Sequence, residues 1–195
     1  MPQREGLGSS RPRRDMSHPG FRITGATTVG RLEFLQLDEL EVVPPSGRPV
    51  TRIVVRHPGA VAVVPIGGDH LMLIRQYRAA VDTELLEIPA GKLDVAGEAP
   101  LETARRELEE EMGLRASRFE SLGNFYTTPG FSDELMYLYA AYDLAPVAAS
   151  PVGPEEEAAQ IVAVPLAEVP DLIKAGEVRD AKTLIALWWV VAGQR

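Results

Sequence analysis

The sequence contains no cysteine, which excludes disulfide scaffolds and zinc sites with cysteine ligands. It also contains no apolar run that approaches the roughly 20 residues needed to span a bilayer. The first residues lack the apolar segment of a secretory signal. We therefore expect a cytoplasmic protein that does not bind a membrane.

Positive charge is scarce as well. Lysine and arginine number 20 against 28 aspartates and glutamates, so the formal net charge is −8. This balance argues against binding to the phosphate backbone of nucleic acid, although it is compatible with one anionic small molecule bound through a metal ion. The chain also has no phosphate-binding P-loop, no G-x-S-x-G turn and no H-E-x-x-H helix, which excludes the enzyme classes that depend on them.

The chain divides into three parts by composition. Residues 1–20 are rich in arginine, serine, glycine and proline and predict a disordered tail, with a nucleic-acid-binding arm as the less favoured alternative. Residues 21–57 contain short β-like runs around a turn at 44–50, which predicts a small antiparallel sheet. Such a sheet is marginal alone, so the main domain at 58–195, a second subunit or both must cover it.

The main domain mixes strands and helices. A continuous apolar run at residues 60–66 predicts a strand covered on both faces, and residues 100–113 predict a helix with proline in its first turn and glycine at its end. Other strands are expected at 70–78, 85–91, 119–127, 134–144 and 159–166, and other helices at 166–178 and 180–194. This mixture indicates an α/β or α+β fold in which helices pack on a mixed sheet.

Acidic residues crowd the predicted helix at 100–113. At 100° per residue, Glu107 and Glu111 lie on one side with Glu110 beside them, whereas Glu109 points away toward solvent. Three carboxylates on one face are the hard oxygen ligands that Mg²⁺ or Mn²⁺ prefers. Arg106 lies four residues before Glu110 and can orient it by pairing. Taken alone, the same pattern also fits a charged helix face exposed to solvent.

The segment around this helix resolves the choice. "GKLDVAGEAPLETARRELEEEMGL", Gly91 to Leu114, resembles the Nudix box, and its second half matches at every specified position. One departure is that six residues, rather than five, separate Gly91 from Glu98. The extra residue lies in the loop before the helix, where an insertion costs little and leaves the helix register unchanged. The resemblance implies that Glu98 and Arg106 pair to brace the loop on the helix.

Other segments are similar to the ADP-ribose pyrophosphatase branch of the Nudix family, among them "LIRQYR", "ELLEIPAG", "PGFSDE" and "GEVRDAKTLIALWW". This resemblance implies a Nudix fold, an α/β/α sandwich with a mixed sheet, and Mg²⁺-dependent hydrolysis of ADP-ribose to AMP and ribose 5-phosphate. It also implies a homodimer in which the N-terminal sheets reach across to the partner. The alternatives are another nucleotide sugar such as GDP-mannose, or a non-catalytic module that senses ADP-ribose. The intact box glutamates argue against the last alternative.

The resemblance also implies the metal ligands. Glu107 and Glu111 are expected to be the principal ligands, Glu110 is expected to assist in binding and catalysis, and the backbone carbonyl of Ala90 is expected to complete the site. A glycine at position 91 has a physical reason, because a side chain there would hinder a diphosphate that approaches the backbone. A simple turn glycine explains the same residue equally well.

Substrate contacts follow from the same comparison. Arg75 and Arg78 lie three apart on a predicted strand and so face opposite sides, which leaves one of them for the phosphates. The resemblance favours Arg78, and a salt bridge on the sheet is the alternative. Glu87 resembles an acidic residue near the substrate, although a structural role is equally compatible. Glu134 is expected near the metal or the terminal ribose, and Phe131 near the ribose.

A general base is expected on a loop before a late strand. Box glutamates bound to metal are poor bases, because coordination lowers their proton affinity. Here the matching stretch offers Glu155, Glu156 and Glu157 after a segment rich in proline and glycine. Counting back from Pro165 favours Glu155 or Glu156, and we choose Glu156 of the two.

Overall fold

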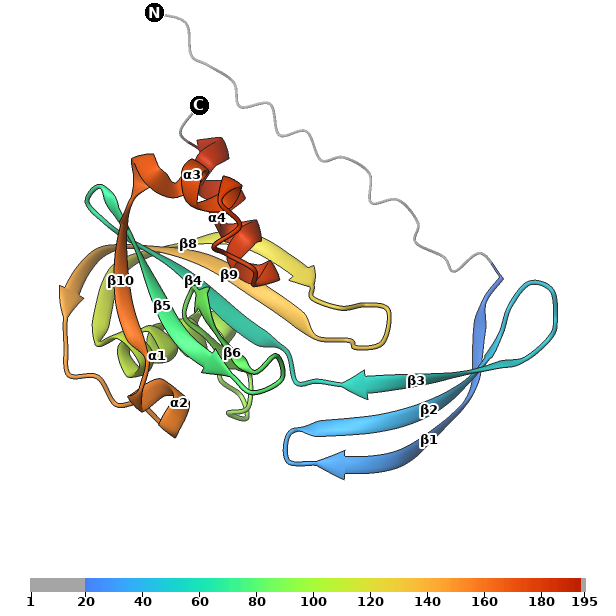
Figure 1. Cartoon of the computed structure of the whole chain (residues 1–195). Helices are drawn as coiled ribbons and strands as arrows, with labels where there is room; N and C mark the ends of the chain where they lie inside the picture. The colour runs from blue at the N-terminus through green and yellow to red at the C-terminus, as the bar shows by residue number, and fades with distance from the viewer. Residues whose placement is uncertain (1–19, 194–195) are drawn as a thin grey trace, which may run out of the picture.

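The computed structural model describes residues 20–193 (Figure 1), so the predicted tail lies outside the described residues apart from Gly20. Its elements, in chain order, are β1 (Arg22–Leu32), β2 (Leu35–Val43), β3 (Val50–Arg56), β4 (Ala60–Gly67), β5 (His70–Arg78), β6 (Thr83–Glu87), β7 (Ala90–Lys92), α1 (Pro100–Met112), β8 (Leu114–Tyr126), β9 (Leu135–Pro146), α2 (Pro154–Glu157), β10 (Gln160–Pro165), the 3₁₀ turn η1 (Leu166–Glu168), α3 (Val169–Lys174) and α4 (Ala181–Gly193). No helix within residues 20–193 combines the length and the apolar character needed to cross a membrane.

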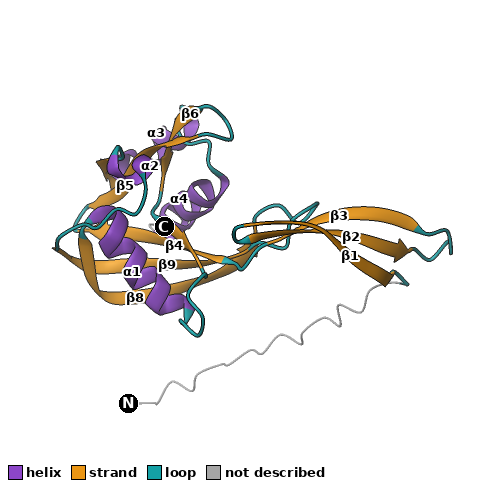
Figure 2. Ribbon diagram, turned by 90° about the horizontal axis from the view of Figure 1, so that it is seen from below, coloured by secondary structure: helices purple, strands orange, loops and turns teal. Residues whose placement is uncertain are grey.

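The first three strands form a separate antiparallel sheet in the order β1-β2-β3, as the sequence predicts. Figure 2 shows this sheet extending away from the main body. It joins the body at the end of β3, where the backbone N–H of Val55 donates to the carbonyl of Phe131 at 2.7 Å. Several large apolar side chains of this part of the chain are exposed, namely Phe21, Ile23, Val29, Leu32, Phe34 and Ile53. The single chain therefore leaves the sheet largely uncovered.

The main sheet has seven strands. Its path runs β10-β5-β4-β9-β8, with β6 paired to β5 and β7 paired to β4. β4 and β9 are parallel whereas the other pairs are antiparallel, so the sheet is mixed. Figure 2 shows α1 on one face of this sheet and α4 on the other. These layers form the α/β/α sandwich expected from the sequence.

The central strand β4 is covered on both faces, as its continuous apolar run predicts. Val61 and Val63 pack in the core beneath α1, whereas Ala62 and Val64 pack in the core beneath α3 and α4. All four side chains are 0% exposed. Because β4 is also paired along its edges with β7 and β9, it is a rigid base for the segments that carry the acidic residues.

Helix α1 begins and ends where its sequence predicts. Pro100 occupies the first turn, where its missing N–H costs no hydrogen bond, and Gly113 ends the helix in the left-handed conformation at φ 58°. Ala104, Leu108 and Met112 are buried against the sheet. This apolar stripe fixes the rotation of the helix about its axis. The acidic side chains beside the stripe are thereby directed to one edge of the sheet.

Candidate active site

A cavity of about 480 Å³ lies where the acidic side of α1 meets the end of β5, β7 and α2. It is lined by Phe34, Gln76, Tyr77, Arg78, Ala79, Ala90, Gly91, Lys92, Asp94, Arg106, Glu107, Glu110, Glu111, Val152, Glu155 and Glu156. A second cavity of about 370 Å³ shares Arg78, Ala90, Gly91 and Lys92 with the first. It adds Ala60, Thr127, Thr128, Glu134, Met136, Asp180, Ala181 and Lys182. The two cavities are therefore neighbours that meet at Arg78 and β7.

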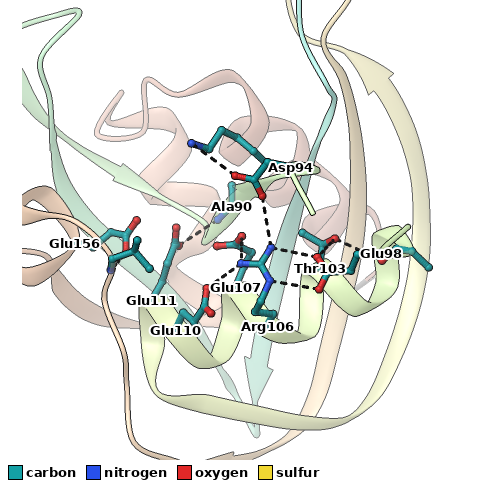
Figure 3. Close-up of polar contacts among 12 residues, drawn as sticks. Ala90, Asp94, Glu98, Thr103, Arg106, Glu107, Glu110, Glu111 and Glu156 are labelled. Carbon is teal, nitrogen blue, oxygen red and sulfur yellow. Dashed lines mark hydrogen bonds and ion pairs between the residues drawn. The ribbon is translucent and has the colours of Figure 1, made fainter. Parts of the chain in front are cut away.

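The three glutamates expected to act together all line the first cavity (Figure 3). Glu107, Glu110 and Glu111 project from one side of α1, as the 100° rotation per residue predicts. Glu109 lies off this side and receives two hydrogen bonds from Arg115, at 2.7 and 2.9 Å. The helix therefore separates one acidic residue that pairs at the surface from three that face the cavity.

Arg106 contacts several carboxylates along the acidic side of α1. Its guanidinium is 3.2 Å from Glu98 and 2.9 Å from Glu110, as the brace and the i,i+4 pair predict. It also lies 2.7 Å from Glu107, a contact the sequence did not predict. Burial works to lower the pKa of Arg106, but these carboxylates outweigh burial and raise its pKa overall. Arg106 thus draws Glu107 and Glu110 toward itself. Among residues 20–193, no three acidic or histidine side chains are grouped as a metal site in this arrangement.

Glu111 has weaker compensation for its charge. Its carboxylate accepts one hydrogen bond, from the backbone N–H of Ala90 at 3.2 Å. Burial and, to a lesser extent, the neighbouring carboxylate of Glu107 together raise the pKa of Glu111 to about 8. Burial likewise raises the pKa of Glu107 to about 7, against the opposing effect of Arg106. Two buried carboxyl groups that are costly to ionise side by side are the oxygen donors that a divalent cation stabilises, so these residues fit a metal ion.

We expect the metal-free protein to lose stability as the pH rises from about 5 to about 8. The folded-state pKa values of Glu107 and Glu111 lie above the ordinary value of 4.5, so in this range the folded chain retains protons that the unfolded chain has released. Thermal denaturation with a chelator present should show Tm falling across this range. The fall should be shallower in Glu111→Gln, which cannot titrate. A Tm of the wild type that rises throughout the range would contradict the assignment.

Gly91 is required by close packing rather than by its backbone conformation. A Cβ atom built on Gly91 would lie 1.9 Å from Cδ of Glu107, far inside van der Waals contact. Gly91 lies in β7 and has no left-handed φ, so the turn interpretation is wrong. The glycine allows the Glu107 carboxylate to rest on the backbone beside Ala90. This approach places two of the expected metal ligands next to one another.

We expect Gly91→Ala to lower kcat/KM about 10²-fold, since a displacement of about 1 Å in a catalytic group costs this much. The added methyl group must push Glu107 away from β7, because a contact of 1.9 Å cannot persist. Gly130→Ala is the matched control, since nothing lies within 4 Å of a Cβ at that position. Steady-state kinetics of both variants test the prediction. Wild-type kinetics for Gly91→Ala would show that the position of Glu107 is unimportant.

The two arginines of β5 are separated as the strand geometry predicts. Arg78 lines both cavities, whereas Arg75 lines neither of them. Arg78 also forms a salt bridge with Glu87, the alternative considered for it, and its contact with the phosphates stays a prediction. Glu87 is 1% exposed and lies behind Arg78 rather than on a cavity wall. Burial would raise the pKa of Glu87, but Arg78 and Lys182 outweigh burial and lower it.

The segment between β8 and β9 contributes Thr127, Thr128 and Glu134 to the second cavity. Glu134 lines the second cavity and accepts a hydrogen bond from Oγ1 of Thr127 at 2.5 Å. Phe131 is 56% exposed and lines neither cavity. Its backbone carbonyl instead holds the end of β3. Within this single chain, the segment thus connects the N-terminal sheet to the second cavity.

The expectation that the three late glutamates lie in a loop is wrong. They belong to a one-turn helix, α2, in which Pro154 sets the first φ angle and the carboxylates lie near the positive end of the turn. Glu155 and Glu156 line the first cavity, whereas Glu157 is exposed and does not. Oε2 of Glu156 accepts a hydrogen bond from the backbone N–H of Val152 at 2.7 Å. Figure 3 shows Glu156 beside Glu111, and its charge helps to raise the pKa values of both Glu107 and Glu111.

The sequence did not lead us to predict several of the residues that line the two cavities, Lys182 and Phe34 among them. Lys182 lies in the first turn of a helix that reads as apolar, and it is buried with its charge paired. Phe34 lies between β1 and β2, and its ring contacts Nζ of Lys92 with 4.4 Å to the centroid. The sequence does offer one signal for Lys182. Asp180 and Lys182 lie at the start of an apolar helix, and charged groups beside a buried helix face must find partners.

Comparison with protein families agrees with this geometry. The family model described as the NUDIX domain matches residues 56–187. The chain belongs to the Nudix family. The resemblance noted from Gly91 to Leu114 is therefore confirmed, and the inserted residue before Glu98 does not disturb the helix of the Nudix box.

Individual relatives cover most of this Nudix protein. The methanol dehydrogenase activator of Bacillus methanolicus is 40% identical over 162 residues, which cover 83% of this chain and 86% of the relative. The ADP-ribose pyrophosphatase of Bacillus subtilis (strain 168) is 36% identical over 162 residues, with the same coverage of 83% and 86%. A crystal structure of an ADP compounds hydrolase has a TM-score of 0.80 at 29% identity and covers 90% of this chain and 94% of that chain. The Nudix fold is thereby confirmed, and the chain is a Nudix hydrolase.

Proposed function

We propose that this Nudix hydrolase cleaves the diphosphate bond of ADP-ribose to give AMP and ribose 5-phosphate. The observation that carries the proposal is that Glu107, Glu110 and Glu111 line one cavity together with Arg78. A diphosphate is negatively charged on both phosphates, so a divalent ion held by carboxylates and an adjacent arginine complement it. The 36% identity to an ADP-ribose pyrophosphatase over most of both chains supports ADP-ribose as the substrate.

We propose Mg²⁺ as the ion, with Mn²⁺ as the alternative. Glu107 and Glu111 would be its principal ligands, Glu110 would assist, and the carbonyl of Ala90 would complete the set. When bound, such an ion neutralises phosphate charge and lowers the pKa of a water molecule. Arg106, which is paired with Glu98, would keep Glu110 oriented while the ion competes with Arg106 for Glu107.

We propose Glu156 as the general base, with Glu155 as the alternative. The oxygen of a water molecule attacks one phosphorus, the bond from that phosphorus to the bridging oxygen breaks, and the bridging oxygen leaves with the other phosphate. The base takes the proton that the water loses. Glu156 is suited to this step because it lines the cavity beside Glu111 yet belongs to a separate element. Arg78 would bind the phosphates, and Glu134 would lie toward the second cavity.

A substrate panel tests the proposal. Purified protein is assayed with ADP-ribose, GDP-mannose, NADH and diadenosine polyphosphates, each with Mg²⁺ and with Mn²⁺. The proposal expects the highest kcat/KM for ADP-ribose. A preference for GDP-mannose would support hydrolysis of a diphosphate bond but would show that ADP-ribose is not the preferred substrate. Inactivity toward every compound would favour the non-catalytic module that senses ADP-ribose.

We also propose that the protein is a homodimer in which the 21–57 sheet contributes to the partner's site. The exposed apolar side chains of this sheet, Ile23 on β1 and Ile53 on β3 among them, support this proposal, because a small sheet needs an apolar surface to be covered. Light scattering should give twice the chain mass of 21.2 kDa. Ile23→Asp should shift the protein toward monomer and reduce activity. A stable and active wild-type monomer would remove this idea.

A second candidate role is the activation of a methanol dehydrogenase. The observation in its favour is the 40% identity to the activator of Bacillus methanolicus over 86% of that protein's length. Adding the purified protein to a methanol dehydrogenase and comparing the dehydrogenase rate with and without it tests this role. Hydrolysis and activation are compatible, so the substrate panel and this assay are scored separately.

A further inference from the structure

A buried group of charged side chains lies behind Arg78, apart from the carboxylates of α1. Glu87 accepts two hydrogen bonds from Arg78, from Nε at 2.8 Å and from Nη2 at 2.7 Å. Lys182 is 9% exposed, and its Nζ contacts the same carboxylate. One carboxylate that is 1% exposed thus holds two cations from different elements, β5 and α4.

Lys182 is itself held in place from the other side. Its Nζ lies 3.0 Å from Oδ2 of Asp180, which also accepts hydrogen bonds from the backbone N–H and the hydroxyl of Thr183 at 2.9 and 2.6 Å. The hydroxyl oxygen of Thr183 accepts a hydrogen bond from the backbone N–H of Ile88 at 2.9 Å. These contacts tie the first turn of α4 to the chain just after β6. A lysine fixed in this way has little freedom to turn toward a ligand.

The charge balance gives this arrangement a consequence for the cavity. An arginine paired bidentately with one carboxylate presents almost no net charge to a phosphate. Lys182 shares the carboxylate of Glu87 with Arg78, so Glu87 does not neutralise Arg78 alone. With Asp180 beside Lys182 the group is balanced, with two cations and two carboxylates, and loss of the lysine charge would leave it at −1. Arg78 is the exposed end of this group, with 41% of its side chain accessible, and it lies where the two cavities meet. Because Nε and Nη2 are committed to Glu87, Nη1 is available for an anion.

We propose that Lys182 is a positioning residue which acts through Glu87 on Arg78. It keeps the guanidinium at the boundary of the two cavities and offsets part of the negative charge that Glu87 would otherwise direct at Arg78 alone. This inference rests on the proposed function, because it concerns how Arg78 binds that substrate. Lys182 acts on binding of the substrate in its ground state, so its effect falls on KM more than on kcat.

The test compares three variants with ADP-ribose as the substrate. Lys182→Met, which keeps length and removes charge, should raise KM about 10-fold, the size of one charge-assisted hydrogen bond, and should change kcat less than about three-fold. Lys182→Arg restores the charge and should recover most of the affinity. Lys174→Met is the matched control, since the side chain of Lys174 is 76% exposed and pairs with Asp171. It should behave as wild type.

A double-mutant cycle separates positioning from direct contact. In an Arg78→Ala background, Lys182→Met should change KM less than about two-fold, because its only route to the substrate has been removed. An undiminished effect there would overturn the proposal and place Lys182 on the substrate. An unchanged KM for Lys182→Met alone, with a lowered Tm, would overturn it in favour of a purely structural role.

A second variant at position 182 and the activity of the wild type complete the test. If Lys182→Met does not fold, Lys182→Gln also removes the positive charge while keeping a polar group that can donate to Glu87, and it should raise KM in the same direction. A KM for a folded Lys182→Gln equal to that of the wild type would overturn the proposal. Wild-type protein that fails to hydrolyse ADP-ribose defeats the proposed function, whereas active wild type with an unaffected Lys182→Met defeats this inference alone.

Discussion

Glu111→Gln is expected to fold as the wild type does and to lose about 10³-fold or more in kcat with ADP-ribose and Mg²⁺. Glutamine preserves the shape of the side chain and can still accept the hydrogen bond from Ala90. It removes a negative charge that a divalent ion needs, and the resulting loss of several kcal/mol of transition-state stabilisation corresponds to a rate change of this size. Removing a buried charge that is costly to ionise should also leave Tm in chelator unchanged or higher.

Glu109→Gln is the matched control for this variant. Glu109 lies two residues earlier on the same helix, pairs with Arg115 and lines neither cavity. Loss of an exposed pair of this kind has little effect on stability, so the turnover of Glu109→Gln should stay close to wild type. Equal turnover for Glu111→Gln and Glu109→Gln would mean that the acidic edge of α1 is only a solvated surface.

Glu156→Gln is expected to lower kcat about 10²–10⁴-fold, the range that general base catalysis supplies. Metal and substrate should still bind, because Glu156 lies on α2 and is not among the expected ligands. The variant keeps the hydrogen bond that the side chain accepts from Val152, so α2 should persist. Kinetics together with calorimetric titration of Mg²⁺ separate lost turnover from lost binding.

The neighbouring glutamates of α2 provide the controls. Glu157→Gln should be close to wild type, because Glu157 is exposed and lines neither cavity. Glu155→Gln removes the other cavity-lining carboxylate of α2 and should have the smaller effect of the two. Turnover near wild type in all three variants would place the base elsewhere, with Glu134 as the next candidate.

The sequence was sufficient for the helix that carries the acidic residues and for the strand beneath it. Pro100, the apolar stripe and Gly113 define α1, and a helix of known start and rotation determines which glutamates share a side. The unbroken apolar run of β4 predicts burial on both faces, because polar residues alternate with apolar ones only when one face is wet. These features are local in the chain, so one sequence determines them.

The contacts that the sequence did not reveal join residues far apart in the chain. Lys182 meets Glu87 across 95 positions, and Ile88 meets Thr183 across 95 as well. The close approach of Glu107 to Gly91 depends on how α1 seats on β7, which no periodicity encodes. Helix α2 was missed because one turn is too short to show a helical period, and its proline and glycine read as a loop.

The most direct test of the proposed function is an analysis of the products formed from ADP-ribose. Wild-type protein is incubated with ADP-ribose and Mg²⁺, with a parallel sample of Glu111→Gln, and the mixtures are separated by chromatography over time. Hydrolysis at the diphosphate predicts AMP and ribose 5-phosphate appearing in equal amounts in the wild-type sample, and almost none with Glu111→Gln. Intact ADP-ribose after prolonged incubation of folded wild-type protein would contradict the proposal, as would equal product formation by the two proteins.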